Sequence, residues 1–302
     1  MIRIEAVDLS DKRQVGRFLE LPFRLYRGHP LWVPPIRIDA AAMLNPGKHP
    51  FYEHSEAEFF VAVRDGEVVG RLGLLENKPY NRYHDKRTGQ FYLFECVEDL
   101  EVARGLFERA AERARARGLT QLVGPKGFGP LDGYGLLVEG FEFRPAMTMM
   151  NYNPPYYPQF AEALGFRKEV DFISCYLTPE KFKLDERIHR IAGRAARHSG
   201  LRVIRFQTKK ELRAWAPRIG TAYNQAFVNN WEYYPLSEHE IQFVLDNVMT
   251  IADPKLIKLI AHGERVVGFL FAFPDLSAAI QRGGGRLLPF GLIDLLLEFK
   301  RT

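Results

Sequence analysis

The stretch Glu58–Asn77, EFFVAVRDGEVVGRLGLLEN, decides the fold, because the chain contains this hairpin pattern twice. Two apolar runs flank Asp65-Gly66, a pair that favours a two-residue turn since both positions tolerate positive φ. The second copy, KLIKLIAHGERVVGFLFAF, occupies residues 255–273 and repeats Val-Val-Gly at an offset of 198 residues. The sequence therefore predicts two related hairpins in two related modules.

The repeat extends to the segments before each hairpin. Residues 1–7 and 201–206 both predict strands, and residues 11–26 and 209–227 both predict helices. Trp32 and Trp231, each followed by proline, lie 199 residues apart. A period this long indicates duplication of a whole domain and excludes a solenoid.

The second copy is expected to be incomplete. After its hairpin the chain reads PDLSAAIQRGGGRLLPFGLIDLLLEFKRT, which has no counterpart in the first copy. The apolar helix predicted at residues 287–299 would then leave hydrophobic surface exposed. We expect either a homodimer through this C-terminal apolar surface or a longer parent gene.

Further elements follow the first hairpin. The segment 89–97 predicts a third antiparallel strand, and Asp99 can cap a helix that follows it over residues 100–119. Strands are predicted at 121–125, 147–152 and 168–177, with a short helix at 154–166 closing at Gly165. The predicted fold class is mixed α/β (α+β) with a predominantly antiparallel sheet.

Composition narrows the class of protein. With 302 residues, 46% of them hydrophobic, the chain can bury real cores, so wholesale disorder is excluded. No apolar run is long enough to span a bilayer and no secretory signal is evident, so we expect a cytoplasmic protein with no membrane partner. Cys96 and Cys175 lie in apolar runs and are expected to be buried free thiols. No Cys/His spacing resembles a zinc site, so no metal is expected.

A net charge of +5 favours anionic small molecules as partners. Basic residues are concentrated at 181–202, where a solvated linker helix is the favoured interpretation. The alternative is a patch for nucleic acid or membrane. Because no aromatic residues are interleaved with the arginines after Phe182, we expect no nucleic-acid partner.

Several short segments carry a family resemblance. They are HPFYEH (49–54), Gly124-Pro125, NPPYY (153–157) and the ALGF that ends at Phe166. Together with the order of elements, these segments resemble the GNAT superfamily of acyl-CoA-dependent N-acyltransferases, and within it an uncharacterised, duplicated bacterial GNAT-like family. The resemblance implies tandem GNAT-like domains: a complete one at 1–178, a basic helical linker at 179–200, and the N-terminal half of a second at 201–302.

The resemblance also implies a site. In the family the fourth strand parts from the fifth, and acetyl-CoA or another acyl-CoA lies along it as the cosubstrate of a small-molecule amine acceptor. Mapped onto this sequence, Glu95 becomes the general base or a carboxylate that orients the base, and Tyr156 or Tyr157 the acid that protonates the thiolate. The implied cofactor contacts are Phe94, Cys96, Val97, Arg104, Gly105 and Asn153. The residues alone leave open that Glu95 is structural and that the tyrosines only pack.

The expected pyrophosphate loop departs from the family pattern. Residues 98–105 read EDLEVARG, with three acidic side chains and no pair of glycines for close backbone approach. The glycine-rich segment 124–129 is expected to be a connection that faces the substrate. Two functions therefore remain: an acyl-CoA-dependent N-acyltransferase with a degenerate cofactor loop, or a non-catalytic GNAT-like ligand-binding or scaffold protein.

Overall fold

The computed structural model describes residues 1–129, 132–145, 150–178, 180, 182–198 and 200–301. It divides into two compact units, and each is described by itself. Unit 1 comprises Met1–Lys168 with Asp275–Thr302, and unit 2 comprises Glu169–Pro274. The sequence-based boundaries at 178 and 200 remain a prediction. Residues 275–301, which we expected to belong with the second copy, instead pack with unit 1.

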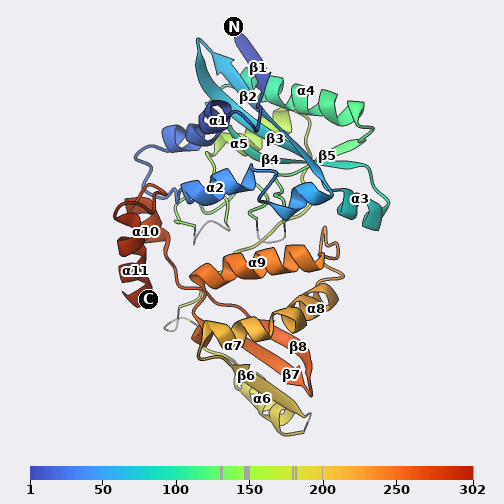
Figure 1. Cartoon of the computed structure of the whole chain (residues 1–302), viewed down its shortest axis with the longest axis vertical. Helices are drawn as coiled ribbons and strands as arrows, with labels where there is room; N and C mark the ends of the chain where they lie inside the picture. Colours follow the sequence, from blue (N-terminus) through green and yellow to red (C-terminus); the bar gives the residue numbers. More distant parts are fainter. Residues whose placement is uncertain (130–131, 146–149, 179, 181, 199, 302) are drawn as a thin grey trace. The chain divides into compact units, whose positions relative to one another are not determined.

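Unit 1 is built on one five-stranded sheet in the order β1-β2-β3-β4-β5 (Figure 1). The strands are β1 (Ile2–Ala6), β2 (Glu56–Arg64), β3 (Glu67–Glu76), β4 (Thr88–Cys96) and β5 (Gln121–Val123). The first four are antiparallel, as predicted, and β5 pairs in parallel with β4. The sheet thus ends in a short parallel strand beside a much longer one.

Helices cover both faces of this sheet, because successive side chains of β2 point to opposite faces. Phe60 and Ala62 belong to one buried cluster with α4 (Leu100–Ala116) and α5 (Tyr156–Ala163). Phe59, Val61 and Val63 belong to the other, with α1 (Lys12–Leu25). The remaining helical elements of unit 1 are α2 (Arg37–Met43), η1 (Pro50–Glu53), α3 (Lys78–His84), α10 (Ser277–Arg282) and α11 (Gly291–Arg301).

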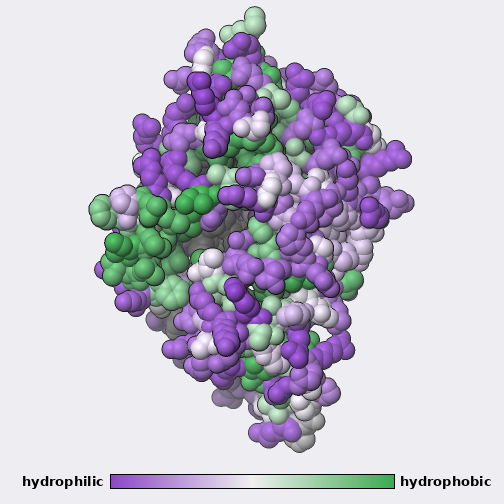
Figure 2. Space-filling view, viewed as in Figure 1, coloured by the Kyte–Doolittle hydropathy of each residue, from purple (hydrophilic) through white to green (hydrophobic). Residues whose placement is uncertain are grey.

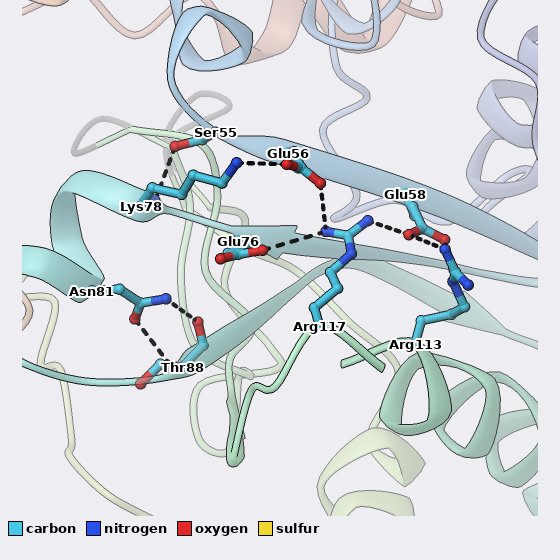
Figure 3. A network of polar contacts seen from close by, with 9 residues as sticks. All are labelled: Ser55, Glu56, Glu58, Glu76, Lys78, Asn81, Thr88, Arg113 and Arg117. Carbon is cyan, nitrogen blue, oxygen red and sulfur yellow. Dashed lines mark hydrogen bonds and ion pairs between the residues drawn. The ribbon is translucent and has the colours of Figure 1, made fainter. Parts of the chain in front are cut away.

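Polar contacts hold α4 on the sheet at both ends. Asp99 caps its N-terminus by accepting a hydrogen bond from the Glu101 amide, as the sequence predicts. Near its C-terminus, Arg113 makes two hydrogen bonds to Glu58 on β2, of 2.8 and 2.9 Å. Arg117 pairs with the same carboxylate and lies within 3.9 Å of Glu76 on β3 (Figure 3). These contacts fix the position of the helix along the strands.

Unit 2 contains a three-stranded antiparallel sheet in the order β6-β7-β8. Its strands are β6 (Leu201–Arg205), β7 (Lys258–His262) and β8 (Arg265–Leu270). Its helical elements are α6 (Glu186–His198), α7 (Lys209–Ala214), α8 (Ala216–Ala226), α9 (Glu238–Ile251) and η2 (Pro254–Leu256). The single helix predicted at 209–227 is interrupted at Trp215, just before Pro217. The basic segment predicted as a linker helix forms α6.

The registers of the two sheets confirm the repeat. In unit 1, Ile2 pairs with Arg64, and the β2–β3 register shifts by one residue between Ala62 and Val63. In unit 2, Leu201 pairs with His262, and the β7–β8 register shifts between Ile260 and Ala261. The two β-bulges stand 198 residues apart, the offset of the Val-Val-Gly motif. The β1–β3 and β6–β8 meanders are therefore copies of one design.

The predicted strand at residues 168–177 and the predicted burial of Cys175 are wrong. Residues 168–177 are not in a strand, and Phe172, Ile173 and Tyr176 are exposed. Cys175 lies in the same segment and is exposed, whereas Cys96 is buried as predicted. A strand forms only where a neighbour supplies a hydrogen-bonding edge, which the local sequence does not reveal. The strand predicted at 147–152 falls partly on residues 146–149, outside the described residues; residues 150–152 are not in a strand.

Helix α9 was not predicted, although its sequence carries a start signal. Ser237 accepts a hydrogen bond from the Glu240 amide, and the Glu240 side chain accepts one from the Ser237 amide. This reciprocal capping box is readable as Ser-x-x-Glu ahead of an apolar run.

The repeat supplies a matched pair of glycines for a stability test. A Cβ on Gly70 would lie 2.7 Å from Val102 and 2.9 Å from Leu106, whereas a Cβ on Gly268 would meet its nearest atom, in Ile260, at 3.6 Å. We expect Gly70→Ala to lower the free energy of unfolding by about 1–3 kcal/mol, because α4 must shift from β3. Gly268→Ala should be nearly neutral in urea unfolding followed by circular dichroism. Equal losses in the two variants would contradict this packing.

Candidate active site at the open edge of strand β4

Among the described residues, strand β4 has a strand neighbour on its outer edge only over its first three residues. It pairs with β5 only over Thr88–Gln90, and one further bond joins the Lys126 amide to the Phe91 carbonyl. Beyond Phe91, the described residues that follow β5 make no strand pairing with β4. The parting of the fourth and fifth strands is thus present, at the position the sequence predicts.

Two tyrosines of α5 fill part of this edge. The Tyr156 hydroxyl donates to the Cys96 carbonyl at 2.8 Å, and the Tyr157 hydroxyl accepts from the Cys96 amide at 2.8 Å. Tyr157 is almost completely buried. Both main-chain groups of Cys96 are therefore already hydrogen-bonded to α5.

The Glu95 carboxylate lies at the centre of the site. Its Oε2 accepts hydrogen bonds from Tyr26, at the end of α1, at 2.8 Å and from Tyr157 at 2.7 Å. The two tyrosines belong to elements on opposite faces of the sheet, so the carboxylate is held where both faces meet the edge. Glu95 as a whole residue is partly buried.

A β-bulge decides which side chain faces the neighbouring strand. Gly73 pairs with Tyr92, but Arg71 pairs with Glu95, so β4 carries one extra residue between these pairs. Leu93 absorbs it with a φ of +54°, a conformation that is strained for a residue with a branched side chain. Without the bulge, Phe94 and not Glu95 would stand opposite Arg71.

Arg71 supplies a buried positive charge on the same face. It is 5% exposed, donates to the Phe18 carbonyl at 3.2 Å, and its guanidinium lies 5.0 Å from the centre of the Phe18 ring. Burial raises the pKa of Glu95, while Arg71 and the two tyrosine hydroxyls act to lower it; the net direction is upward. A carboxyl group with a raised pKa is a stronger base once ionised, as general acid–base catalysis requires.

Aromatic rings extend this site along unit 1. The Tyr26 ring stacks on Trp32, with centroids 4.9 Å apart and planes inclined by 14°. On another side, the Tyr152 hydroxyl lies 3.3 Å from Nε2 of His29. Amphipathic aromatic rings thus surround Tyr26, one of the two tyrosines that contact Glu95.

The structure brings Glu95, Cys96, Tyr156 and Tyr157 together but separates the other sequence-predicted residues. Phe94 packs in the core against Phe107 and also against the Tyr157 ring, and the Val97 amide donates to Val69 on β3. Asn153 braces the chain by accepting from the Leu137 amide at 2.7 Å and donating to the Leu137 and Pro154 carbonyls.

Arg104 and Gly105 lie within α4 rather than at its start. Arg104 pairs with Glu101 on the helix surface, and Gly105 packs against Ile4 on β1. Ahead of them, the Asp99 carboxylate accepts the Glu101 amide proton at 2.9 Å and pairs with Arg64 at 2.6 Å. A carboxylate thus occupies the position where a helix N-terminus would receive a phosphate. The pyrophosphate of a CoA does not fit there.

The glycine-rich segment contributes an acidic residue that sequence reasoning missed. Asp132 accepts a hydrogen bond from the Gly129 amide at 2.8 Å. Its charge also acts on Tyr92, which lies on β4 three residues before Glu95. Burial raises the pKa of Asp132 from 3.8 to about 6, although main-chain hydrogen bonds oppose the shift. Gly127 lies so close to Asp132 that no side chain could fit there.

Two more residues of the site were missed, and one of them has a sequence signal. Arg71 is a charge in an otherwise apolar strand, VVGRLGLL, which is a sign of a buried polar partner. Tyr26 ends a helix and has no such signal, because its proximity to Glu95 depends on the packing of α1 against β3 and β4.

The described part of the chain has neither a membrane-spanning helix nor a cluster of metal-binding side chains. No helix there is both long enough and apolar enough to cross a membrane. Within the same residues, no group of three or more His, Cys, Asp and Glu side chains is arranged to hold a metal ion.

No family model matches this chain. Two curated proteins are similar to it in sequence. One is Protein YghO of Escherichia coli strain K12, 26% identical over 96% of this chain and 73% of that protein. The other is the bacterial ceramide synthase of Caulobacter vibrioides, 28% identical over 98% of this chain and 77% of that protein. Both alignments run through unit 1 and unit 2.

Solved structures give a more distant likeness. A tandem GNAT protein from the clavulanic acid biosynthesis pathway aligns with 89% of this chain and 73% of its own, at 16% identity and a TM-score of 0.48. A predicted acetyltransferase with acetyl-CoA from Clostridium acetobutylicum aligns with 58% of this chain and 96% of its own, at 10% identity and a TM-score of 0.37. Scores this low do not bear on chemistry. The GNAT-like fold of unit 1 rests on its own strand order, with β4 and β5 parallel and parting.

The raised pKa of Asp132 predicts a pH-dependent stability. Between roughly pH 4 and pH 6 the folded state binds more protons at this carboxyl than the unfolded state, so stability falls as pH rises. Asp132→Asn keeps an acceptor for the Gly129 amide but cannot ionise. It should unfold like the wild type near pH 4 and be more stable by up to about 3 kcal/mol near pH 7. The measurement is urea unfolding at both pH values, and an equal difference at the two would contradict the shift.

Proposed function

We propose that this chain is an N-acyltransferase that moves an acyl group from a thioester to an amine, with Glu95 as the general base. The observation that carries the proposal is the Glu95 carboxylate at the open edge of β4, held by Tyr26 and Tyr157, with its pKa raised by burial. A carboxylate that is fixed by hydrogen bonds beside the edge of a strand suits proton abstraction from a bound amine.

The proposed reaction needs no covalent enzyme intermediate. The amine nitrogen attacks the thioester carbonyl carbon while Glu95 removes a proton from that nitrogen. The carbon–sulfur bond then breaks, and the departing thiolate takes a proton from a tyrosine hydroxyl. Both tyrosines remain candidates: the Tyr157 hydroxyl donates to Glu95 and can recover a proton from it, but its side chain is almost completely buried. Tyr156 donates to a main-chain carbonyl instead.

The acceptor we propose is an amine that carries a long alkyl chain. The support is the ceramide synthase relative, which aligns with nearly the whole of this chain. A ceramide is the amide of a long-chain amino alcohol, so its synthesis joins an acyl group to a lipophilic amine. The rings of Trp32 and Tyr152 around Tyr26, which contacts Glu95, fit such an acceptor better than a highly charged one.

The acyl donor is proposed to be acetyl-CoA or a longer acyl-CoA, bound differently from the family pattern. Because Asp99 and its partner Arg64 occupy the start of α4, the nucleotide end of the donor must lie elsewhere. The thioester end would still approach β4 near Glu95. The cytoplasmic location and the division at 178 and 200 remain predictions.

The same acidic helix start favours a second candidate, a non-catalytic GNAT-like binding module. Such a module would use the β4 edge for a ligand without transferring an acyl group. Two measurements distinguish the candidates. Calorimetry should show that the transferase binds palmitoyl-CoA or acetyl-CoA, and a thiol assay should show that it releases free thiol when an amine is added. A chain that binds neither thioester would be the binding module.

Glu95→Gln tests the catalytic assignment. The amide can still accept the tyrosine hydrogen bonds but cannot remove a proton, so kcat/KM should fall by about 10²–10⁴-fold. The rise of wild-type activity with pH, which follows ionisation of Glu95, should also disappear. Thiol release from palmitoyl-CoA with a long-chain amine is the assay, and Glu108→Gln, an exposed change on α4, is the control. Unchanged activity in Glu95→Gln would remove Glu95 from the mechanism.

A further inference from the structure

Helix α11 presents an apolar face to solvent. Six hydrophobic side chains along it and just before it are between 48% and 75% exposed: Leu288, Phe290, Leu292, Ile293, Leu296 and Leu297. Figure 2 shows them as a continuous hydrophobic area over the α10–α11 region, at the left of the view. Patches of this kind mark a surface that binds a partner.

The helix is held firmly in place despite this exposure. Arg282 on α10 pairs with Asp294 at 2.9 Å and with Glu298 at 2.6 Å, and both carboxylates belong to α11. The Arg37 amide donates to the Gly285 carbonyl at 2.9 Å. Residue 285 must be glycine, because its φ is positive and its Cα lies close to the Pro35 main chain. The apolar face is therefore a fixed feature of unit 1.

The charges around this face are complementary to an anionic lipid surface. Arg282 pairs with both acidic side chains of α11, Asp294 and Glu298, and the exposed Arg286, Lys300 and Arg301 add further positive charge, so basic side chains outnumber acidic ones here by four to two. An exposed apolar face flanked by basic residues is the pattern of helices that lie in the membrane interface. Such a helix needs no bilayer-spanning length, so the lack of a spanning run does not bear on it.

The same helix pair is connected to the proposed base through direct contacts. Gln281 on α10 donates to the Pro30 and Trp32 carbonyls at 3.0 and 2.9 Å. The Trp32 ring stacks on Tyr26, and the Tyr26 hydroxyl donates to Glu95. Two residues thus separate the α10–α11 pair from the reacting carboxylate, all within unit 1.

We infer that the apolar face of α11 docks on an anionic membrane surface and so brings Glu95 to a lipophilic amine held in that membrane. This inference rests on the proposed function, since a lipid acceptor must be taken from a bilayer. It replaces the homodimer that the sequence suggested for this surface and the expectation that no membrane takes part. The lipid surface is favoured because basic side chains at both ends of the helix would repel a second copy.

Vesicle flotation of the full chain tests the inference. Wild-type protein should float with vesicles of phosphatidylcholine and phosphatidylglycerol and bind pure phosphatidylcholine less. Ile293→Ser with Leu296→Ser should reduce the bound fraction at least about tenfold, because two inserted side chains are lost. Ile188→Ser with Ile191→Ser is the matched control, since these residues are 51% and 57% exposed on the basic helix α6. Circular dichroism checks that both variants fold.

Three results would overturn the inference. The first is wild-type protein that stays unbound to both kinds of vesicle, and the second is a loss of binding in the α6 variant alone. A wild-type dimer in analytical ultracentrifugation that the α11 variant dissociates, with no vesicle binding, would assign the face to a second copy. The proposed function is tested separately, by measuring thiol release by the wild-type protein with a water-soluble amine in the absence of vesicles. Activity there without vesicle binding removes only the docking surface.

Discussion

The two hydrogen bonds that Glu95 accepts, from Tyr26 and from Tyr157, are the interaction on which the site depends. They join the end of α1, strand β4 and helix α5 at one carboxylate, beyond the three residues over which β4 pairs with β5. The bulge at Leu93 places Glu95 opposite Arg71, so a buried positive charge compensates part of the cost of burying the carboxyl group. Strained backbone, buried charge and raised pKa thus occur together, as they do at functional sites.

Duplication explains the framework but not the chemistry. Both meanders keep the same register and the same bulge, so this geometry is a property of the repeated hairpin itself. Among the described residues, only the first copy continues into a long fourth strand with a tyrosine-bearing helix beside it. The α10–α11 segment follows the second copy in sequence yet packs with the first, through Gln281 and Gly285. The α10–α11 segment is therefore continuous with the second copy in sequence but belongs to the first in space.

The sequence predicted what local patterns determine. Asp-Gly between apolar runs gave the hairpin, Asp99 gave the start of α4, and Gly165 gave the end of α5. Prediction failed where a long-range partner decides: residues 168–177 have strand composition but no strand, and Cys175 is exposed with them. Within the site, Glu95, Tyr156 and Tyr157 followed from the family resemblance, whereas Tyr26 and Asp132 depend on how a helix end and a loop pack against β4. No local pattern records such packing.

The most direct test of the account is the pKa of Glu95 itself, measured by carbon-13 NMR titration of the side-chain carboxyl and assigned with Glu95→Gln. The account predicts a pKa above the ordinary value of 4.5, because burial outweighs the attraction of Arg71. It also predicts a further rise in Tyr26→Phe, since that change removes a hydrogen bond that favours the ionised carboxylate. A pKa at or below the ordinary value in the wild type, unmoved by Tyr26→Phe, would contradict the assignment of Glu95 as a tuned base.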